Sequence, residues 1–238
     1  MKTKEMLYNF VLEHRERLLL MALLFLSTLL SIAMVGFRIT YSNTWTYIFL
    51  IWNLFLAWVP LYCAILLWWL VRWEFRSPLI VLPVVGVWLA FFPNAPYIVT
   101  DFLHLTPRQN IPIWYDLMLI FSFAWNGLSV GYASLWIMQN LAEQLYGRLM
   151  GWLLVVGTLA ASGFGIYIGR FLRWNSWDFL TDPHGLLHDI APRLLNPLEH
   201  PQTAAVSLLF STFLLLSYLT MTMLIAAKWQ PGLAVTRK

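Results

Sequence analysis

The segment FFPNAPYIVTDFLHL, residues 91–105, ends a long apolar run with two prolines and several polar side chains. Pro93 and Pro96 cannot extend a helix without losing backbone hydrogen bonds, so the apolar helix is predicted to stop before them. Asn94 can cap a new helix, with Pro96 in its first turn, where a missing N–H costs nothing. The segment therefore predicts a membrane helix that ends at one face of a bundle, followed by a short helix over 95–105.

Three polar side chains share one face of that short helix, because Tyr97, Asp101 and His104 follow i,i+4 and i,i+3 spacing. Non-helical backbone near membrane depth is tolerated only where protein or water covers it. The turn at 93–96 is therefore expected to face the interior of a bundle or a water-filled vestibule, with this polar face beside it.

The composition is that of a membrane protein. Of the 238 residues, 60% are hydrophobic and only 11% are charged, whereas a soluble domain carries about 25% charged residues. Apolar blocks of about 20 residues cross a bilayer as helices, because lipid offers the backbone no hydrogen bonds. The blocks are too long and too uniformly apolar for barrel strands, which alternate. The predicted fold class is all-α, a polytopic membrane protein in a single domain over residues 1–238.

Six segments are predicted to span the membrane, at about 18–37, 47–71, 79–92, 113–138, 150–168 and 204–227. The first has a basic flank, as a signal peptide has, but its apolar stretch is too long and no small-x-small cleavage site follows. It is therefore expected to stay as an anchor. The prediction is a six-helix bundle with a short interfacial helix after the third span.

Basic residues between the spans predict the orientation of the bundle. Side one comprises the N-terminus, the loops at 72–78 and 139–149, and the C-terminus. It holds ten basic residues: Lys2, Lys4, Arg15, Arg17, Arg72, Arg76, Arg148, Lys228, Arg237 and Lys238. Side two holds five: Arg38, Arg108, Arg170, Arg173 and Arg193. The bias puts side one and both termini in the cytoplasm. The net charge of +4 fits orientation signals and anionic head groups rather than nucleic acid.

Aspartate and histidine are concentrated on side two, in or beside its two larger loops. These residues are Asp101, Asp116, Asp178, Asp182, Asp189, His104, His184, His188 and His200. Side one carries glutamates and His14 but no aspartate. Random placement on solvated faces would not readily sort the residue types this way, so any chemistry is predicted on side two.

The stretch GIYIGRFLRWNSWD, residues 165–178, is the second polar segment. It carries two arginines at i,i+3 spacing, two tryptophans, an asparagine and an aspartate: Arg170, Arg173, Trp174, Trp177, Asn175 and Asp178. One interpretation is that the arginines reach for head groups beside interfacial tryptophans. The other includes the asparagine and the aspartate in a site where the arginines bind an anionic group, such as a lipid phosphate or carboxylate.

His184 and His188 are four residues apart, a spacing that can chelate a metal ion on a helix, with Asp101 or His104 completing the shell. A neighbouring proline and glycine make that helix short, and no HExxH signature is present. The alternative is an amphipathic segment lying on the membrane surface. Metal binding is the weaker of the two interpretations, and the sequence indicates no particular cofactor.

Asp116 opens the fourth span, and Asn53 and Asn126 lie deeper in the second and fourth spans. Ionisable groups at membrane depth usually face the interior of a bundle. An ion pair of Asp116 with Arg170 or Arg173 is therefore expected, either as part of a functional site or as a structural staple between helices.

Small residues predict close packing of the fourth and fifth spans. They form a GxxxG pattern in the fourth span and a four-residue ladder in the fifth: Gly127 and Gly131, then Gly157, Ala161, Gly165 and Gly169. Such spacing lets helix backbones approach closely. That packing would bring Asp116 and the 170–178 segment together on side two.

The strings FFPNAPYIVTDFLHL, WYDLMLIFSFAWNG and GIYIGRFLRWNSWD resemble the signature segments of an uncharacterised integral membrane family, domain of unknown function 1361. The resemblance covers the third span through Asp178, together with the six-span layout. It implies a bacterial inner-membrane protein, and it supplies no activity.

Three functions fit these patterns. An enzyme at the outer leaflet would take its acid–base groups from Asp101, His104, Asp116 and Asp178. The residues predicted to bind its substrate are Asn94, Tyr97, Arg170, Arg173, Trp174, Asn175 and Trp177. A small transporter would need a dimer of six-helix units and has its helix break at one face. A scaffold or accessory subunit would use the polar cluster only to staple the bundle. The preferred reading is a protein that binds or modifies an amphiphilic, anionic, lipid-like molecule.

Overall fold

The computed structural model describes residues 2–75, 77–108, 111–175 and 177–227. Within them every regular element is helical, and six runs are long and apolar enough to cross a membrane: Arg15–Ser42, Phe49–Arg72, Pro78–His104, Ile113–Tyr146, Arg148–Leu172 and Pro201–Ala226. The predicted all-α polytopic membrane bundle is confirmed. Four of the basic residues counted for the orientation lie outside the described residues: Arg76, Lys228, Arg237 and Lys238.

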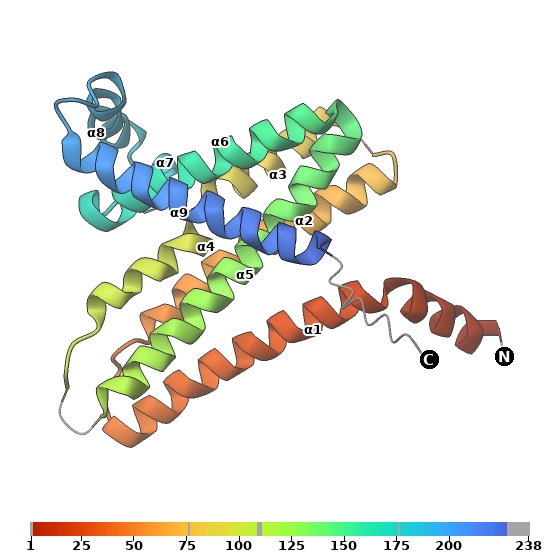
Figure 1. Ribbon diagram of the computed structural model, residues 1–238, viewed down its shortest axis with the longest axis horizontal. Helices are drawn as coiled ribbons and strands as arrows, with labels where there is room; N and C mark the ends of the chain where they lie inside the picture. The colour runs from red at the N-terminus through yellow and green to blue at the C-terminus, as the bar shows by residue number, and fades with distance from the viewer. Residues whose placement is uncertain (1, 76, 109–110, 176, 228–238) are drawn as a thin grey trace, which may run out of the picture.

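The helices follow one another as α1 (Lys2–Ser42), α2 (Phe49–Arg72), α3 (Pro78–Phe91), α4 (Asn94–Tyr97), η1 (Ile98–His104), α5 (Ile113–Tyr146), α6 (Arg148–Tyr167), η2 (Ile168–Leu172), α7 (Asp178–Thr181), α8 (Pro183–Leu195) and α9 (Pro201–Ala226). Figure 1 shows the start of α1, the α2–α3 and α5–α6 connections and the end of α9 toward one end of the bundle. The end of α1, the start of α5 and α8 lie toward the other end.

Helices α2 and α5 are shared by two buried apolar clusters. The first joins them to α1 and η1 through side chains such as Leu50, Ile98 and Phe123. The second joins them to α3, α6 and α9 through side chains such as Trp88 and Leu214. Large apolar side chains elsewhere on α1 and α9 point outward, as a surface in contact with lipid requires.

The third span is broken rather than ended at its prolines. After α3, helical structure resumes at Asn94 as the single turn α4 and continues as the 3-10 helix η1. The Ala95 N–H bonds the Phe92 carbonyl at 3.1 Å, which leaves the Phe91 carbonyl without the N–H that a regular α-helix would bring to it. The Asn94 side-chain amide donates to that carbonyl at 3.0 Å. The expected N-cap role of Asn94 is therefore wrong, because its side chain satisfies the helix behind it.

The glycines of α5 allow the backbone at the break of the third span, rather than α6, to approach α5 closely. A Cβ on Gly127 would lie 2.7 Å from the Ala95 carbonyl oxygen, and one on Gly131 would lie 2.8 Å from the Ala95 Cβ. On the other side, a Cβ on Gly165 would lie 3.0 Å from Pro93. The predicted packing of the fourth and fifth spans is confirmed, because α5 and α6 pack together, but Gly127 and Gly131 lie against Ala95 rather than against α6. The glycines let both helices approach the PNAP turn.

Candidate functional site

A pocket of about 230 Å³ lies where the third span breaks, between α2, the α4–η1 segment and the end of α6. Eight of the residues predicted to form a site line it: Asn94, Tyr97, Asp101, His104, Arg170, Trp174, Asn175 and Trp177. Its other walls come from residues that the sequence analysis did not assign to a site: Phe49, Trp52, Asn53, Leu56, Pro93, Gly165 and Gly169. The two polar segments of the sequence therefore meet in one pocket.

Arg170 is the centre of the hydrogen-bond network in this pocket. Its Nε and Nη2 donate to the Thr100 hydroxyl at 2.9 and 2.6 Å, and Nη2 also donates to Asp101 Oδ1 at 2.5 Å. The guanidinium carbon lies 4.5 Å from the centre of the Tyr97 ring, within the range of a cation–π contact. The arginine thus ties the end of α6 to the broken third span.

Asp101 is fully engaged by its neighbours. Its side chain is only 1% exposed, and its second oxygen, Oδ2, accepts from the Asn53 amide at 2.9 Å. Each carboxylate oxygen therefore has a protein donor, and the charge is balanced by Arg170. Asn53 is the pocket residue that sequence reasoning came nearest to finding, since a polar side chain inside a span signals an interior position.

The contact between Arg170 and His104 defines the tautomer of the histidine. Arg170 Nη1 lies 2.9 Å from His104 Nε2, and a guanidinium has only donors. Nε2 is therefore assigned as the acceptor, with the ring proton on Nδ1. The ring also packs edge-on against Phe49, with 5.2 Å between ring centres.

A widened turn carries Arg170 into the pocket. Helix α6 ends at Tyr167, and residues Ile168–Leu172 form the π-helix η2. Arg173 then adopts a left-handed conformation with φ of 63°, and the Trp174 N–H bonds back to the Ile168 carbonyl. Single π-turns of this kind recur at functional sites.

Arg173 and Asp178 were predicted as site residues and do not line the pocket. Arg173 is exposed. Asp178 Oδ2 accepts from the backbone N–H of Asn175 at 2.6 Å and from its side-chain amide at 3.2 Å. Asp178 therefore positions a lining residue from behind.

The family model described as "Protein of unknown function (DUF1361)" matches residues 52–217, more than two thirds of the chain. The protein belongs to this family. The resemblance noted for the third span through Asp178 is therefore confirmed, and all but one of the pocket residues lie inside the matched region. No curated protein and no solved structure matches the chain.

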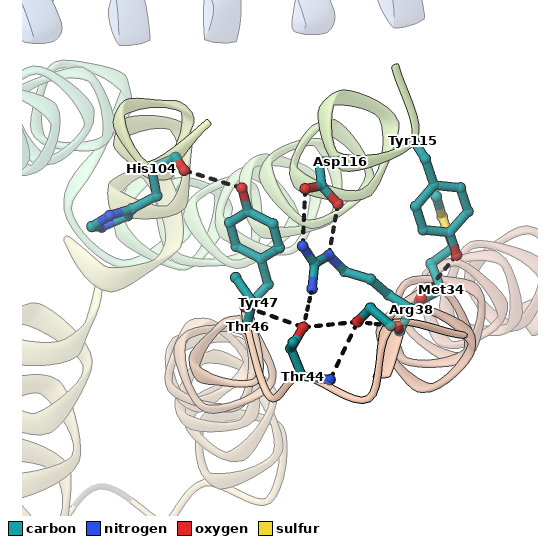
Figure 2. Close-up of polar contacts among 9 residues, drawn as sticks. Met34, Arg38, Thr44, Thr46, Tyr47, His104, Tyr115 and Asp116 are labelled. Atoms are coloured by element: carbon teal, nitrogen blue, oxygen red, sulfur yellow. Dashed lines mark hydrogen bonds and ion pairs between the residues drawn. The ribbon is translucent and has the colours of Figure 1, made fainter. Parts of the chain in front are cut away.

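In this DUF1361 protein Asp116 belongs to a second polar centre. Both of its carboxylate oxygens accept from Arg38, from Nε at 2.7 Å and from Nη2 at 3.1 Å. The two side chains are 1% and 2% exposed, and Figure 2 shows them facing each other between α1 and α5. The expected ion pair of Asp116 with Arg170 or Arg173 is wrong, because the end of α1 brings Arg38 to the same depth.

Tyr47 connects the two polar centres of the DUF1361 bundle. Its ring centre lies 4.8 Å from the guanidinium carbon of Arg38. Its hydroxyl donates to the backbone carbonyl of His104 at 3.0 Å (Figure 2). One side chain therefore contacts both the buried ion pair and the end of η1, which carries a pocket residue.

His184 and His188 lie on α8 and are exposed. Among the described residues of the DUF1361 protein, no group of three or more His, Cys, Asp and Glu side chains could hold a metal ion. Helix α8 instead connects to the pocket wall, because the Trp174 indole N–H donates to Asp189 Oδ2 at 2.8 Å. Asp182 accepts from the Gly185 N–H at 2.9 Å and caps the start of α8.

Proposed function

We propose that this protein binds the polar end of an amphiphilic, lipid-like molecule in the pocket at the break of the third span. The observation that carries the proposal is a single hydrogen-bonded wall in that pocket, formed by Asn53, Asp101, Arg170 and His104. The rest of the lining includes the aromatic side chains of Phe49, Trp52, Tyr97, Trp174 and Trp177. Ligand pockets typically combine an apolar, aromatic lining with a few polar groups that orient the ligand.

The aromatic lining supports an amphiphile over a fully water-soluble ligand. Trp52 and Trp177 line the pocket, yet they remain 52% and 40% exposed. Trp52 stacks on Phe55, which is 55% exposed one turn further along α2. A polar end in the pocket and an apolar tail along these rings would match the amphipathic character of interfacial aromatic residues.

Binding is favoured over modification by the state of the acid–base groups. Asp101 and Asp116 each use both oxygens to accept from an arginine or an amide, and Asp178 holds Asn175. Of the four predicted catalytic residues, only His104 has a polar side-chain atom without a protein partner among the described residues, its Nδ1. A general base needs a free lone pair near the reacting proton. Nδ1 carries the ring proton in this assignment, so it presents an N–H rather than a lone pair.

The basic residues between the spans predict which side of the membrane the pocket faces. We place the pocket on the extracytoplasmic side of a bacterial inner membrane, with both termini in the cytoplasm. Two of the five side-two arginines, Arg38 and Arg170, are paired with aspartates inside the bundle. The orientation itself is carried by the count of ten basic residues on side one against five on side two.

The proposal is tested by identifying the amphiphile that stays bound to the protein during purification. The full chain is extracted from a bacterial membrane in a zwitterionic, sugar-free detergent, and bound lipids are quantified by mass spectrometry per mole of protein. We expect Trp52→Ala to lose most of one retained species. Trp125→Ala, a matched change on α5 at a tryptophan that is 61% exposed and outside the pocket lining, should keep it.

Equal retention in wild type, W52A and W125A would overturn the proposal. The scaffold interpretation would then be preferred, in which the polar network only staples the bundle. The transporter interpretation has less support, because Asn126 donates to the Thr28 hydroxyl at 2.9 Å and so joins α5 to α1.

A further inference from the structure

We propose that the polar end bound in this pocket is an uncharged polyol of one sugar ring, rather than a phosphate or carboxylate head group. This inference rests on the proposed function and names the chemistry of its ligand. It replaces the anionic ligand that the arginines suggested in the sequence.

The first argument is that the charges of the pocket are already balanced. Arg170 places four of its donor contacts on Thr100, Asp101 and His104. Asp101, only 1% exposed, is in direct ion-pair contact with this arginine. An anion that captured Arg170 would leave a buried carboxylate without its partner, which is strongly unfavourable.

The second argument is that the groups left unused are neutral. The carbonyl oxygens of Asn53 and Asn175, the hydroxyl of Tyr97 and the Nδ1–H of His104 have no hydrogen-bond partner among the described residues. They form a mixed set of acceptors and donors along one pocket. A hydroxyl both donates and accepts, so a ring bearing several hydroxyls satisfies such a set, whereas a phosphate offers mainly acceptors.

The third argument is the shape of the remaining wall. Trp52, Trp174 and Trp177 line the same pocket, and the flat apolar faces of aromatic rings pack well against the C–H faces of a sugar ring. The cavity of about 230 Å³ is large enough for one monosaccharide ring.

The experiment compares three lipids that differ only in the head group. The full chain is placed in phosphatidylcholine nanodiscs that contain equal amounts of monoglucosyl diacylglycerol, phosphatidylglycerol and diacylglycerol, and retained lipids are counted by native mass spectrometry. We expect the glucosyl lipid to be enriched on the order of tenfold, the effect of one to two net hydrogen bonds. Added methyl glucoside should compete with it.

Matched variants separate recognition from folding. Asn53→Leu and Trp52→Ala should each lose the enrichment. Asn140→Leu should keep it, because Asn140 is a half-buried asparagine outside the pocket lining that donates only to the Trp136 carbonyl. Thermal unfolding of each variant identifies those that have lost the fold, and W52A keeps the test valid if N53L does not fold.

The outcomes distinguish this inference from the proposed function. Enrichment of phosphatidylglycerol that W52A abolishes overturns the polyol and leaves the amphiphile site intact. Enrichment of no lipid, together with no binding of methyl glucoside, overturns both. Methyl glucoside that binds while no glucosyl lipid is enriched supports the polyol and shows that its source is a free sugar.

Discussion

Arg38 and Asp116, 78 positions apart, form a two-point ion pair that is shielded from the surroundings between the end of α1 and the start of α5. The arginine also donates to the Thr44 hydroxyl at 3.1 Å and stacks over Tyr47. The pair therefore closes the outermost helix onto the central one and holds the loop between α1 and α2 in place. It lies beside the pocket without lining it, as the contact from Tyr47 to His104 shows.

Breaking this ion pair should destabilise the protein strongly. Asp116→Ala leaves a buried guanidinium without its partner, and such changes cost about 3–5 kcal/mol. The double change R38M/D116L removes both charges and should be much less destabilising. Unfolding in detergent, followed by near-UV circular dichroism, measures both. Asp182→Ala, at an exposed aspartate of the α8 cap, is the control. A single variant as stable as the double variant would contradict the prediction.

Arg170→Lys should weaken retention of the amphiphile while the protein still folds. Lysine keeps the charge but cannot donate hydrogen bonds to Thr100, Asp101 and His104 at the same time, because it lacks the planar, forked guanidinium. We expect a loss on the order of tenfold in retained ligand, about 1.4 kcal/mol, because the pocket residues Asp101 and His104 lose the side chain that positions them. Arg173→Lys is the matched change at the exposed neighbour and should have no effect. Equal losses in both variants would argue against a special role for Arg170.

Gly127→Ala should destabilise the bundle, whereas Gly157→Ala should not. The new methyl group at Gly127 would meet the Ala95 carbonyl at 2.7 Å, while one at Gly157 meets nothing within 4 Å. Overpacking of this kind costs about 1–3 kcal/mol, and alanine in place of an unconstrained helical glycine gains up to about 1 kcal/mol. Thermal unfolding of the two variants in the same detergent gives the comparison. Opposite signs are expected, and a tolerated G127A would contradict the close packing of α5 on the PNAP turn.

Trp174→Phe should release α8 from the pocket wall. Phenylalanine keeps an aromatic ring but lacks the indole N–H that donates to Asp189. Backbone hydrogen exchange over residues 183–195 should accelerate, because α8 buries little else and contacts mainly α7. Trp177→Phe, at a tryptophan 40% exposed that donates no hydrogen bond within the described part of the chain, is the control. Unchanged exchange in W174F would show that α8 is held by other contacts.

Reporter fusions should test the orientation. At the C-terminus, a reporter that functions in the cytoplasm should be active, and one that functions only outside the cytoplasm should be inactive. One joined after Leu198, which is 94% exposed between α8 and α9, should behave as extracytoplasmic. Cytoplasmic activity of both fusions, or the reverse pattern, would contradict the proposed topology.

The sequence predicted the pocket better than it predicted the partners within the bundle. Asp101 and the 170–178 segment were expected to meet on side two, and the pocket contains both Asp101 and Arg170. Apolar length and interruptions by proline are local properties, so they can be recognised without knowing the tertiary structure. The partner of Asp116 was assigned wrongly, because five side-two arginines were available and spacing does not distinguish among them.

Two further details depended on helix rotation. Gly127 and Gly131 were correctly recognised as sites of close backbone approach, but the approaching backbone is Ala95 and not α6. Asn53 was recognised as an interior residue, but its contact with Asp101 requires α2 to turn that face toward η1. A GxxxG pattern defines the face that packs and leaves the neighbour open.

The sequence by itself determined that the chain is an all-α membrane protein of six spans, and it predicted that the aspartates and every histidine but His14 lie on side two. Those properties follow from the apolar length of each segment and from the cost of placing polar backbone in lipid. Only the tertiary structure decided that Arg170 is neutralised by Asp101, that Arg38 holds Asp116, and that a π-turn carries Arg170 into a pocket. Those pairings depend on the relative rotation and depth of helices far apart in the chain, which packing of the whole bundle sets.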